Sequence, residues 1–238
     1  MSRPRPPGAA KRAARPAAAP RLTAKSLGRP EGVTGEETRA RLIEIAATLF
    51  ARSGFNGVSL ADIAGAAGLT APAIYNHFGS KDELFVETVC CMFDEVAAAF
   101  AEAAAAKGAW RDRLFRILDA AREVYRPDGV LQRLGGAARM ETAHHPERFR
   151  RITGAHEQIG DIFRAIAADA QEAGELPADL DPRLAGDLMM SLVMSGIGSA
   201  AYQHPSQDDF DAMVRVFKLV LGAADAAPAQ VRSSSGGR

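Results

Sequence analysis

The sequence has few cysteines, no long apolar run and no excess of either charge. Its two cysteines, Cys90 and Cys91, are neighbours on an expected helix and point about 100° apart. This suits neither a disulfide framework nor a metal-ligand pair, so we expect a reducing compartment and core packing of both residues, with a thiol sensor as the alternative. No segment approaches the roughly 20 apolar residues of a membrane-spanning helix. We therefore expect a cytoplasmic protein with no membrane partner.

The short motifs of common enzymes are also missing. The sequence contains no G-x-S-x-G, no P-loop, no H-E-x-x-H and no glycine fingerprint of a dinucleotide site. Catalysis would need a constellation without a recognised motif. We therefore expect neither an enzyme nor a cofactor.

The histidines in the middle of the chain have a metal-ligand spacing in an unsuitable place. Glu141, His144 and His145 stand at i, i+3 and i+4, and His156 is a possible fourth ligand, but the three end a helix before Pro146. We expect no metal there. His144 remains a candidate donor to a ligand carboxylate, and the alternative is a solvent-facing pair that stabilises the helix C-terminus.

The formal net charge of zero conceals an uneven distribution. The chain has 29 bases and 29 acids, and residues 1–30 hold eight bases and no acid, which leaves 29 − 8 = 21 bases against 29 acids, or −8, for residues 31–238. The first 30 residues are rich in Pro and Ala and should be disordered when free. We interpret them as a basic arm that follows DNA phosphates or enters the minor groove. A solubilising tail, an over-extended start and an organelle transit peptide are the alternatives.

The segment from Thr34 to Phe85 contains the clearest local signals. A hydroxyl and an acid three residues apart predict helix starts at Thr34, Ser59 and Ser80, and Thr70 and Pro72 predict another between them. Within the first helix, one apolar stripe follows helical spacing: Leu42, Ile45, Ala46, Leu49 and Phe50.

The middle of this segment has the pattern of a helix-turn-helix. Ala64 allows two helices to touch, Gly68 allows a tight turn, and Ile74 locks the second helix onto Ile63 and Leu69. An ordinary helical hairpin would satisfy the same spacing.

The rest of the chain is helical in pattern, so we expect an all-α fold. We divide it into a basic arm (1–30), a helix-turn-helix domain (31–80), a second helical domain (81–227), to which the resemblance described next assigns ligand binding and dimerisation, and a Ser/Gly-rich tail (228–238).

Three stretches, TRARLIEIAATLF, GFNGVSLADIAGAAGL and APAIYNHFGSKDELF, resemble the tetracycline-repressor (TetR) family of bacterial regulators over roughly fifty residues. The resemblance implies a homodimer whose third helix lies in the major groove and whose C-terminal domain binds a small ligand. It places these residues at or near DNA: Thr38, Arg39, Ser59, Thr70, Ala71, Pro72, Ala73, Tyr75, Asn76, His77 and Lys81.

These side chains divide into base-reading and phosphate-binding types. Asn76 can contact adenine through its amide, whereas the resemblance assigns phosphate to Tyr75, His77 and Lys81. Packing between helices is the alternative for Tyr75, and it is the expected role of Phe78. Residues 31–89 carry four bases and eight acids, or −4, so either the acids face away from DNA or the arm supplies most of the attraction.

The resemblance also implies a ligand pocket among the middle helices. Its candidate lining residues are Phe93, Phe115, Tyr125, Met140, His144, Phe163 and Met189. The last two helices are apolar enough to form a four-helix dimer interface, with monomer core as the alternative. The candidate interface residues are Leu188, Leu192, Val193, Ile197, Phe210, Met213, Val214, Phe217 and Leu221.

Together these patterns predict a homodimeric regulator of transcription that binds double-stranded DNA. Repression is the expected mode, because a protein in the groove blocks polymerase, and a small apolar or amphipathic effector would release it from a palindromic operator. The alternative is a helical interaction or ligand-binding scaffold that does not bind DNA.

Overall fold

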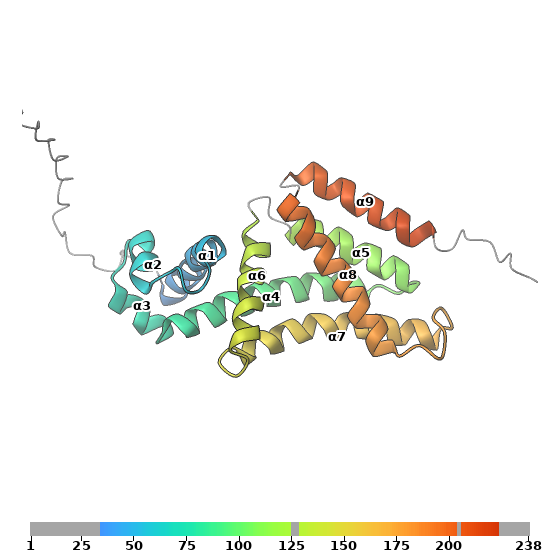
Figure 1. Ribbon diagram of the computed structural model, residues 1–238, viewed down its shortest axis with the longest axis horizontal. Helices are drawn as coiled ribbons and strands as arrows, with labels where there is room; N and C mark the ends of the chain where they lie inside the picture. Colours follow the sequence, from blue (N-terminus) through green and yellow to red (C-terminus); the bar gives the residue numbers. More distant parts are fainter. Residues whose placement is uncertain (1–33, 125–128, 204–205, 224–238) are drawn as a thin grey trace, which may run out of the picture.

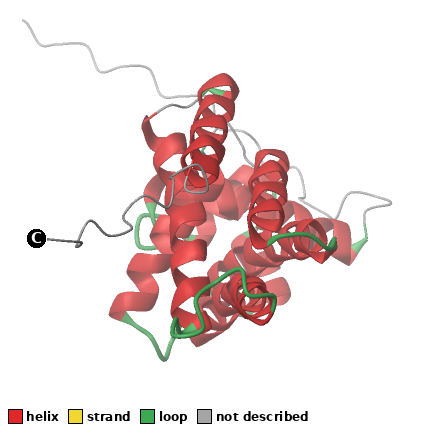
Figure 2. Ribbon diagram, turned by 90° about the vertical axis from the view of Figure 1, so that its right-hand side faces the viewer, coloured by secondary structure: helices red, strands yellow, loops and turns green. Residues whose placement is uncertain are grey.

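The computed structural model describes residues 34–124, 129–203 and 206–223, and the expected arm and tail lie outside these ranges. Within them every regular element is an α-helix, so the expected all-α class is confirmed (Figure 2). The helices are α1 (Gly35–Ser53), α2 (Leu60–Ala67), α3 (Ala71–Phe78), α4 (Lys81–Ala105), α5 (Trp110–Val124), α6 (Val130–His144), α7 (Arg150–Glu172), α8 (Pro182–Gln203) and α9 (Gln207–Ala223). None of these helices is long and apolar enough to span a membrane.

Two expected helix starts are confirmed as complete capping boxes. The Thr34 hydroxyl accepts the Glu37 N–H at 3.1 Å, and the Glu37 carboxylate accepts the Thr34 N–H at 2.7 Å. Ser59 and Asp62 repeat this exchange at the start of α2, at 3.2 and 2.8 Å. Each box satisfies two N–H groups that a helix start leaves unpaired.

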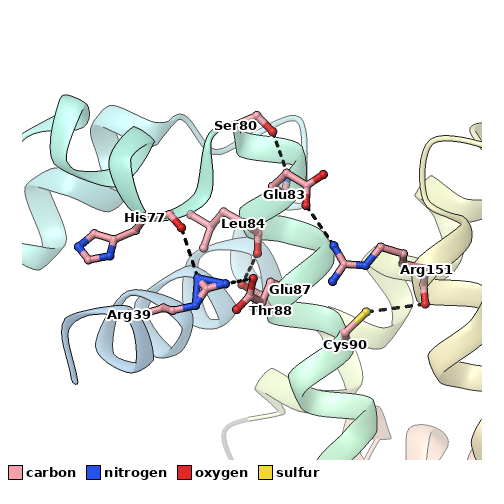
Figure 3. Close-up of polar contacts among 9 residues, drawn as sticks. All are labelled: Arg39, His77, Ser80, Glu83, Leu84, Glu87, Thr88, Cys90 and Arg151. Carbon is pink, nitrogen blue, oxygen red and sulfur yellow. Dashed lines mark hydrogen bonds and ion pairs between the residues drawn. The ribbon is translucent and has the colours of Figure 1, made fainter. Parts of the chain in front are cut away.

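The two other expected starts, at Thr70 and Ser80, are also confirmed as N-caps, but without a complete capping box. The Ser80 hydroxyl accepts the Glu83 N–H at 3.0 Å, but the Glu83 carboxylate bonds the guanidinium of Arg151 on α7 at 3.1 Å (Figure 3). A charged donor binds a carboxylate more strongly than a backbone N–H does, which explains the exchange. Thr70 does occupy the N-cap of α3, but its side chain makes no cap hydrogen bond.

Helix α4 lies at the centre of the fold and contacts α1, α3, α5, α6 and α7. It runs from beside α1–α3 to α5, with α7 along its length and α6 across it (Figure 1). One apolar face of α4 is buried along the helix, through Phe85, Val89, Met92, Phe93, Val96 and Phe100. Burial of each such side chain contributes roughly 1.5–3 kcal/mol. The same hydrophobic core continues through the expected domain boundary at residue 80, so α1–α3, hereafter the headpiece, do not have a separate core.

Four phenylalanines join the headpiece to the rest of the fold. Phe50 lies in the last turn of α1, Phe55 follows that helix, Phe85 lies on α4 and Phe149 precedes α7. The Phe50 and Phe85 rings meet edge to face at 5.0 Å, and Phe149 meets Phe55 and Phe85 at 5.5 and 5.6 Å. Each such pair adds about 0.5–1.5 kcal/mol beyond the area it buries.

Helices α7 and α8 approach closely at one glycine. A Cβ at Gly186 would lie 2.5 Å from the Cα of Arg164, so a side chain there would collide with the α7 backbone. Beside this crossing, the Arg164 guanidinium bonds Asp187 at 2.7 Å. The glycine therefore fixes how α8 lies on α7.

Replacing Gly186 with Ala should lower the free energy of unfolding by about 1–3 kcal/mol, as overpacking usually does. Urea denaturation followed by circular dichroism would measure the change. The control is Gly154→Ala on the exposed side of α7, where nothing lies within 4 Å of the new Cβ. Because Ala favours helix, this control should gain up to about 1 kcal/mol. Equal changes in the two variants would contradict the close crossing.

Candidate functional site

A tight turn positions α3 against α2. Gly68 adopts the left-handed conformation, with φ 68° and ψ 28°, which an L side chain would strain. The next N–H, that of Leu69, donates to the Ala64 carbonyl at 2.9 Å and closes the end of α2. Ile74 is fully buried and Ala64 nearly so, as the helix-turn-helix pattern requires.

The turn leaves one side of α3 free. Ile74 and Phe78 face the core, which confirms the packing role expected of Phe78. The remaining expected residues of this segment are exposed or half-buried: Thr70, Ala71, Pro72, Ala73, Tyr75, Asn76 and His77. Tyr75 is 53% exposed, so it does not pack between helices. The side chains predicted to contact DNA thus share the outer surface of α3.

The Lys81 ammonium, which we expected at a phosphate, is bonded inside the protein. It donates to the carbonyls of Phe55 and Val58, both at 3.0 Å, and lies 4.2 Å from the centre of the Phe55 ring. It therefore ties the start of α4 to the loop between α1 and α2. Two of its three donors are occupied inside the protein, so Lys81 has a structural role, and the phosphate contact expected from the sequence stays a prediction.

Arg39 is likewise engaged within the headpiece. Its guanidinium donates to the His77 carbonyl at 3.4 Å, pairs with Glu87 and lies 4.5 Å from the centre of the Phe78 ring (Figure 3). These contacts hold the end of α3 between α1 and α4. Arg39 is thus a positioning residue for α3, and its predicted DNA contact has no support from this geometry.

The remaining expected residues near the duplex make local contacts. The Thr38 hydroxyl donates to the Thr34 carbonyl at 3.0 Å, and the Ser59 hydroxyl donates to Asp62 at 2.6 Å. Ser59, Tyr75 and Lys81 nevertheless line one open hollow beside the start of α2. The fold therefore does bring these three predicted residues together.

A second concave site lies between α4, α6, α7 and α8. It is a cavity of about 430 Å³, within the range of small-molecule sites. Phe93 lines it, as expected. Sequence reasoning missed Gln132, Arg139 and Thr142 on α6 as lining residues, and Thr153 on α7. Their only signal was a polar residue recurring on one side of an apolar helix.

The other expected ligand residues do not line this cavity. Phe163 and Met189 are buried in the core, and Phe115 packs against it. Met140 is 62% exposed and His144 is exposed, so both point away from the interior. Tyr125 lies outside the described residues. Periodicity identified apolar faces, but it did not show where the faces leave a gap.

His156 also lines the cavity, edge to face with Phe93 at 5.4 Å. Burial lowers the pKa of its imidazole below the ordinary 6.5, and the positive charge of Arg139 lowers it further. The neutral ring is therefore favoured near pH 7.

The alternative metal site near residue 144 is not assembled. Glu141 accepts a hydrogen bond from Asn56 at 3.2 Å, and a ring nitrogen of His144 lies 2.9 Å from the Met140 carbonyl. In the parts of the chain that the structure describes, no three His, Cys, Asp or Glu side chains are placed to hold a metal ion.

The cysteines differ from each other. Cys90 is half-buried and lies 3.7 Å from the Arg151 carbonyl, whereas Cys91 is exposed, so core packing was wrong for Cys91 (Figure 3). Partial burial raises the pKa of both thiols, which disfavours the reactive thiolate.

The last two helices carry an exposed apolar surface. Large apolar side chains are exposed along α8 and α9: Leu184, Leu188, Leu192, Val216, Leu219 and Val220. Two of them, Leu188 and Leu192, were expected at an interface. Surfaces of this kind, on neighbouring helices, are typical of contacts with another protein.

Three expected interface residues belong to the core of the chain itself. Val193, Phe210 and Val214 are buried between α8, α9 and the helices beneath them. Their assignment to a partner surface is therefore corrected. Met213, Phe217 and Leu221 are partly buried against the same core, and the side chain of Ile197 lies outside the described ones.

The tight turn, the exposed α3 and the attached helical body define a helix-turn-helix protein of the DNA-binding class. Residues 42–88 match the sequence model of a family described as bacterial regulatory proteins, tetR family. Over these residues the chain is similar to that family of regulatory proteins.

Comparison with individual proteins shows the same similarity. The chain is 46% identical over 52 residues to the HTH-type transcriptional regulator AcrR of Shigella flexneri, covering 22% of this chain and 24% of AcrR. It is 38% identical over 64 residues to the HTH-type transcriptional repressor KstR2 of Rhodococcus jostii, covering 27% and 31%. It thus spans less than a third of the length of either relative. A TetR-family regulator from Agrobacterium tumefaciens has the same fold, with a TM-score of 0.65, 21% identity, and coverage of 79% and 98%.

The stability of the protein should depend on the protonation of His156. Because its folded pKa lies below its unfolded value, the unfolded state binds more protons as the pH falls through 6.5. The free energy of unfolding should therefore decrease from about pH 7 to about pH 5 more steeply in the wild type than in His156→Leu. Urea titrations at several pH values would measure both slopes. A wild-type slope in His156→Leu would contradict the assignment.

Proposed function

We propose that the protein is a homodimeric, ligand-responsive transcriptional regulator that binds a palindromic DNA operator. It acts as a repressor, in the compartment that holds the DNA, and leaves the operator when a small apolar or amphipathic effector binds. The observation that carries the proposal is the outer surface of α3, which the turn at Gly68 holds away from the core. The names of the relatives, a transcriptional regulator and a transcriptional repressor, support the same function.

Base readout would be sparse and concentrated on one side chain. The exposed amide of Asn76 can make two hydrogen bonds with adenine, which discriminates against a wrong base by about 1–3 kcal/mol. Ala71, Pro72 and Ala73 can offer apolar contact to a thymine methyl group. Tyr75 would bind phosphate through its hydroxyl.

The headpiece itself supplies little electrostatic attraction. Of the four bases in residues 31–89, Arg39 and Lys81 are engaged inside the protein, and the same residues carry eight acids. The eight bases of residues 1–30 would therefore provide much of the attraction to phosphate. This makes affinity depend steeply on salt concentration.

A second copy of the chain is the partner that best fits α8 and α9. Their exposed leucines and valines would meet the same side chains across a two-fold axis and form a four-helix interface. Such a dimer presents two copies of α3, which matches the symmetry of a palindrome.

Helix α6 connects the cavity with the headpiece. One side of it lines the cavity, and its end bonds the headpiece through Glu141 and Asn56 at 3.2 Å. Just beyond α6, Arg148 bonds Asp82 at the start of α4 at 2.6 Å. A ligand that moves α6 would thereby move α3 relative to the dimer axis, which is how effector binding would weaken operator binding.

The engagement of Arg39 and Lys81 also favours a second candidate, a ligand-binding scaffold that does not bind DNA. Selection of bound sequences from a random duplex pool, at physiological salt, separates the two. Recovery of a palindrome supports the regulator, and no enrichment by a folded dimer supports the scaffold.

The variants Asn76→Ala and Tyr75→Phe should affect DNA binding in different ways. Asn76→Ala should reduce discrimination at one base pair in each half-site by about 1–3 kcal/mol. Tyr75→Phe should weaken binding similarly on every sequence, because a phosphate contact carries no base information. Titrations of labelled duplexes with single base-pair changes would measure both. A uniform loss in Asn76→Ala would refute its role in readout.

The double variant Leu188→Glu, Leu219→Glu should dissociate the dimer, because it buries four like charges in the proposed interface. Analytical ultracentrifugation would show monomers, and operator affinity would fall with dimerisation. Leu180→Glu, at an exposed position in the loop before α8, is the control and should remain dimeric. A dimeric double variant would place the interface elsewhere.

A further inference from the structure

One side of α6 forms a strip along the cavity. Gln132, Gly135, Gly136 and Arg139 stand at i, i+3, i+4 and i+7, so they share one helix face, and all four line the cavity. The strip spans about 10 Å at 1.5 Å per residue. It places an amide at one end, two bare glycines in the middle and a guanidinium at the other end.

The amide of Gln132 has no partner inside the described protein. Both its nitrogen and its oxygen are shielded from solvent, and neither makes a hydrogen bond with any described residue. Leaving such a group unsatisfied costs stability, and native proteins contain few of them. A primary amide offers two donors and an acceptor, so its full complement is a group that accepts and donates on neighbouring atoms.

The two glycines leave room beside the helix. A Cβ built at Gly135 or Gly136 meets nothing within 4 Å. Each glycine inside a helix lowers stability relative to alanine. Across the gap stand Phe93 on α4 and the flexible thioether of Met194 on α8. The middle of the cavity therefore suits an apolar body lying flat against the α6 backbone.

The charges around the cavity argue against a cationic ligand. None of the described residues that line it is acidic, and Arg139 brings a positive charge close to His156. A cationic ligand would lose hydration without gaining a carboxylate partner.

We infer that the cavity binds an uncharged amphipathic molecule whose polar end is a carboxamide, or a lactam with the same adjacent donor and acceptor. Its polar end bonds the amide of Gln132, and its apolar body lies over Gly135 and Gly136. This inference rests on the proposed function for its regulatory meaning, because it names the chemical class of the effector.

The test compares three probes with one tail and different heads: octanamide, octanoate and octylammonium. Isothermal titration calorimetry on the full chain should show octanamide binding at least about tenfold more tightly than the other two. In Gln132→Met, which keeps the length of the side chain, octanamide should lose about tenfold in affinity and the preference among heads should disappear. Gln158→Met, on the exposed side of α7, should bind like the wild type.

A second pair of variants tests the place of the apolar body. Gly135→Leu should fill the gap and abolish octanamide binding while circular dichroism shows an intact helical fold. Gly154→Leu, which is also exposed to open space on a helix, should leave binding unchanged.

Three results would overturn the inference. These are no octanamide binding to the wild type at millimolar concentration, an unchanged head preference in Gln132→Met, and tightest binding of octanoate with that preference lost in Arg139→Met. The duplex selection keeps this test separate from the proposed function. A recovered palindrome together with any of the three results would refute the amide class alone, whereas an octanamide site without DNA enrichment would refute the regulator alone.

Discussion

The contact on which the fold depends is the cluster of Phe50, Phe55, Phe85 and Phe149. It draws together the end of α1, the following loop, the start of α4 and the residue before α7. Arg148 and the Lys81 ammonium cover the Phe55 ring and also bond nearby polar groups. Because of this cluster, the headpiece is not a separate module on a linker. Its orientation is set by packing that the body shares.

The two sides of helix α6 affect the stability of the fold in opposite ways. Its cavity side holds an unpaired amide and two glycines, both of which reduce stability, whereas its opposite side packs on α1. A ligand in the cavity would satisfy the unpaired amide and would change how α6 packs on α1. Under the proposed function, this would couple ligand binding to the position of α3.

The features predicted correctly from the sequence are the helix starts and the turn, which depend only on neighbouring residues. Thr34 with Glu37, Ser59 with Asp62, and the turn at Gly68 need only a few neighbouring residues, and the structure confirms them. The sequence could not show that the cations of Arg39 and Lys81 are engaged inside the protein, because a free cation and a cation bonded to a distant carbonyl look alike in a sequence. Likewise, hydrophobic periodicity could not distinguish the buried Val193 from the exposed Leu192 beside it. The cavity arises from four helices at once, so it had no local signal.

The close crossing at Gly186 affects more than the packing of α7 against α8. It sets the rotation of α8 on α7 by backbone contact, and α8 carries part of the surface through which we propose that two copies meet. Two copies of α3 must stand about 34 Å apart to enter successive major grooves on one side of DNA. A residue with no side chain, in a helix separate from α3, would therefore help to set the half-site spacing that the dimer accepts.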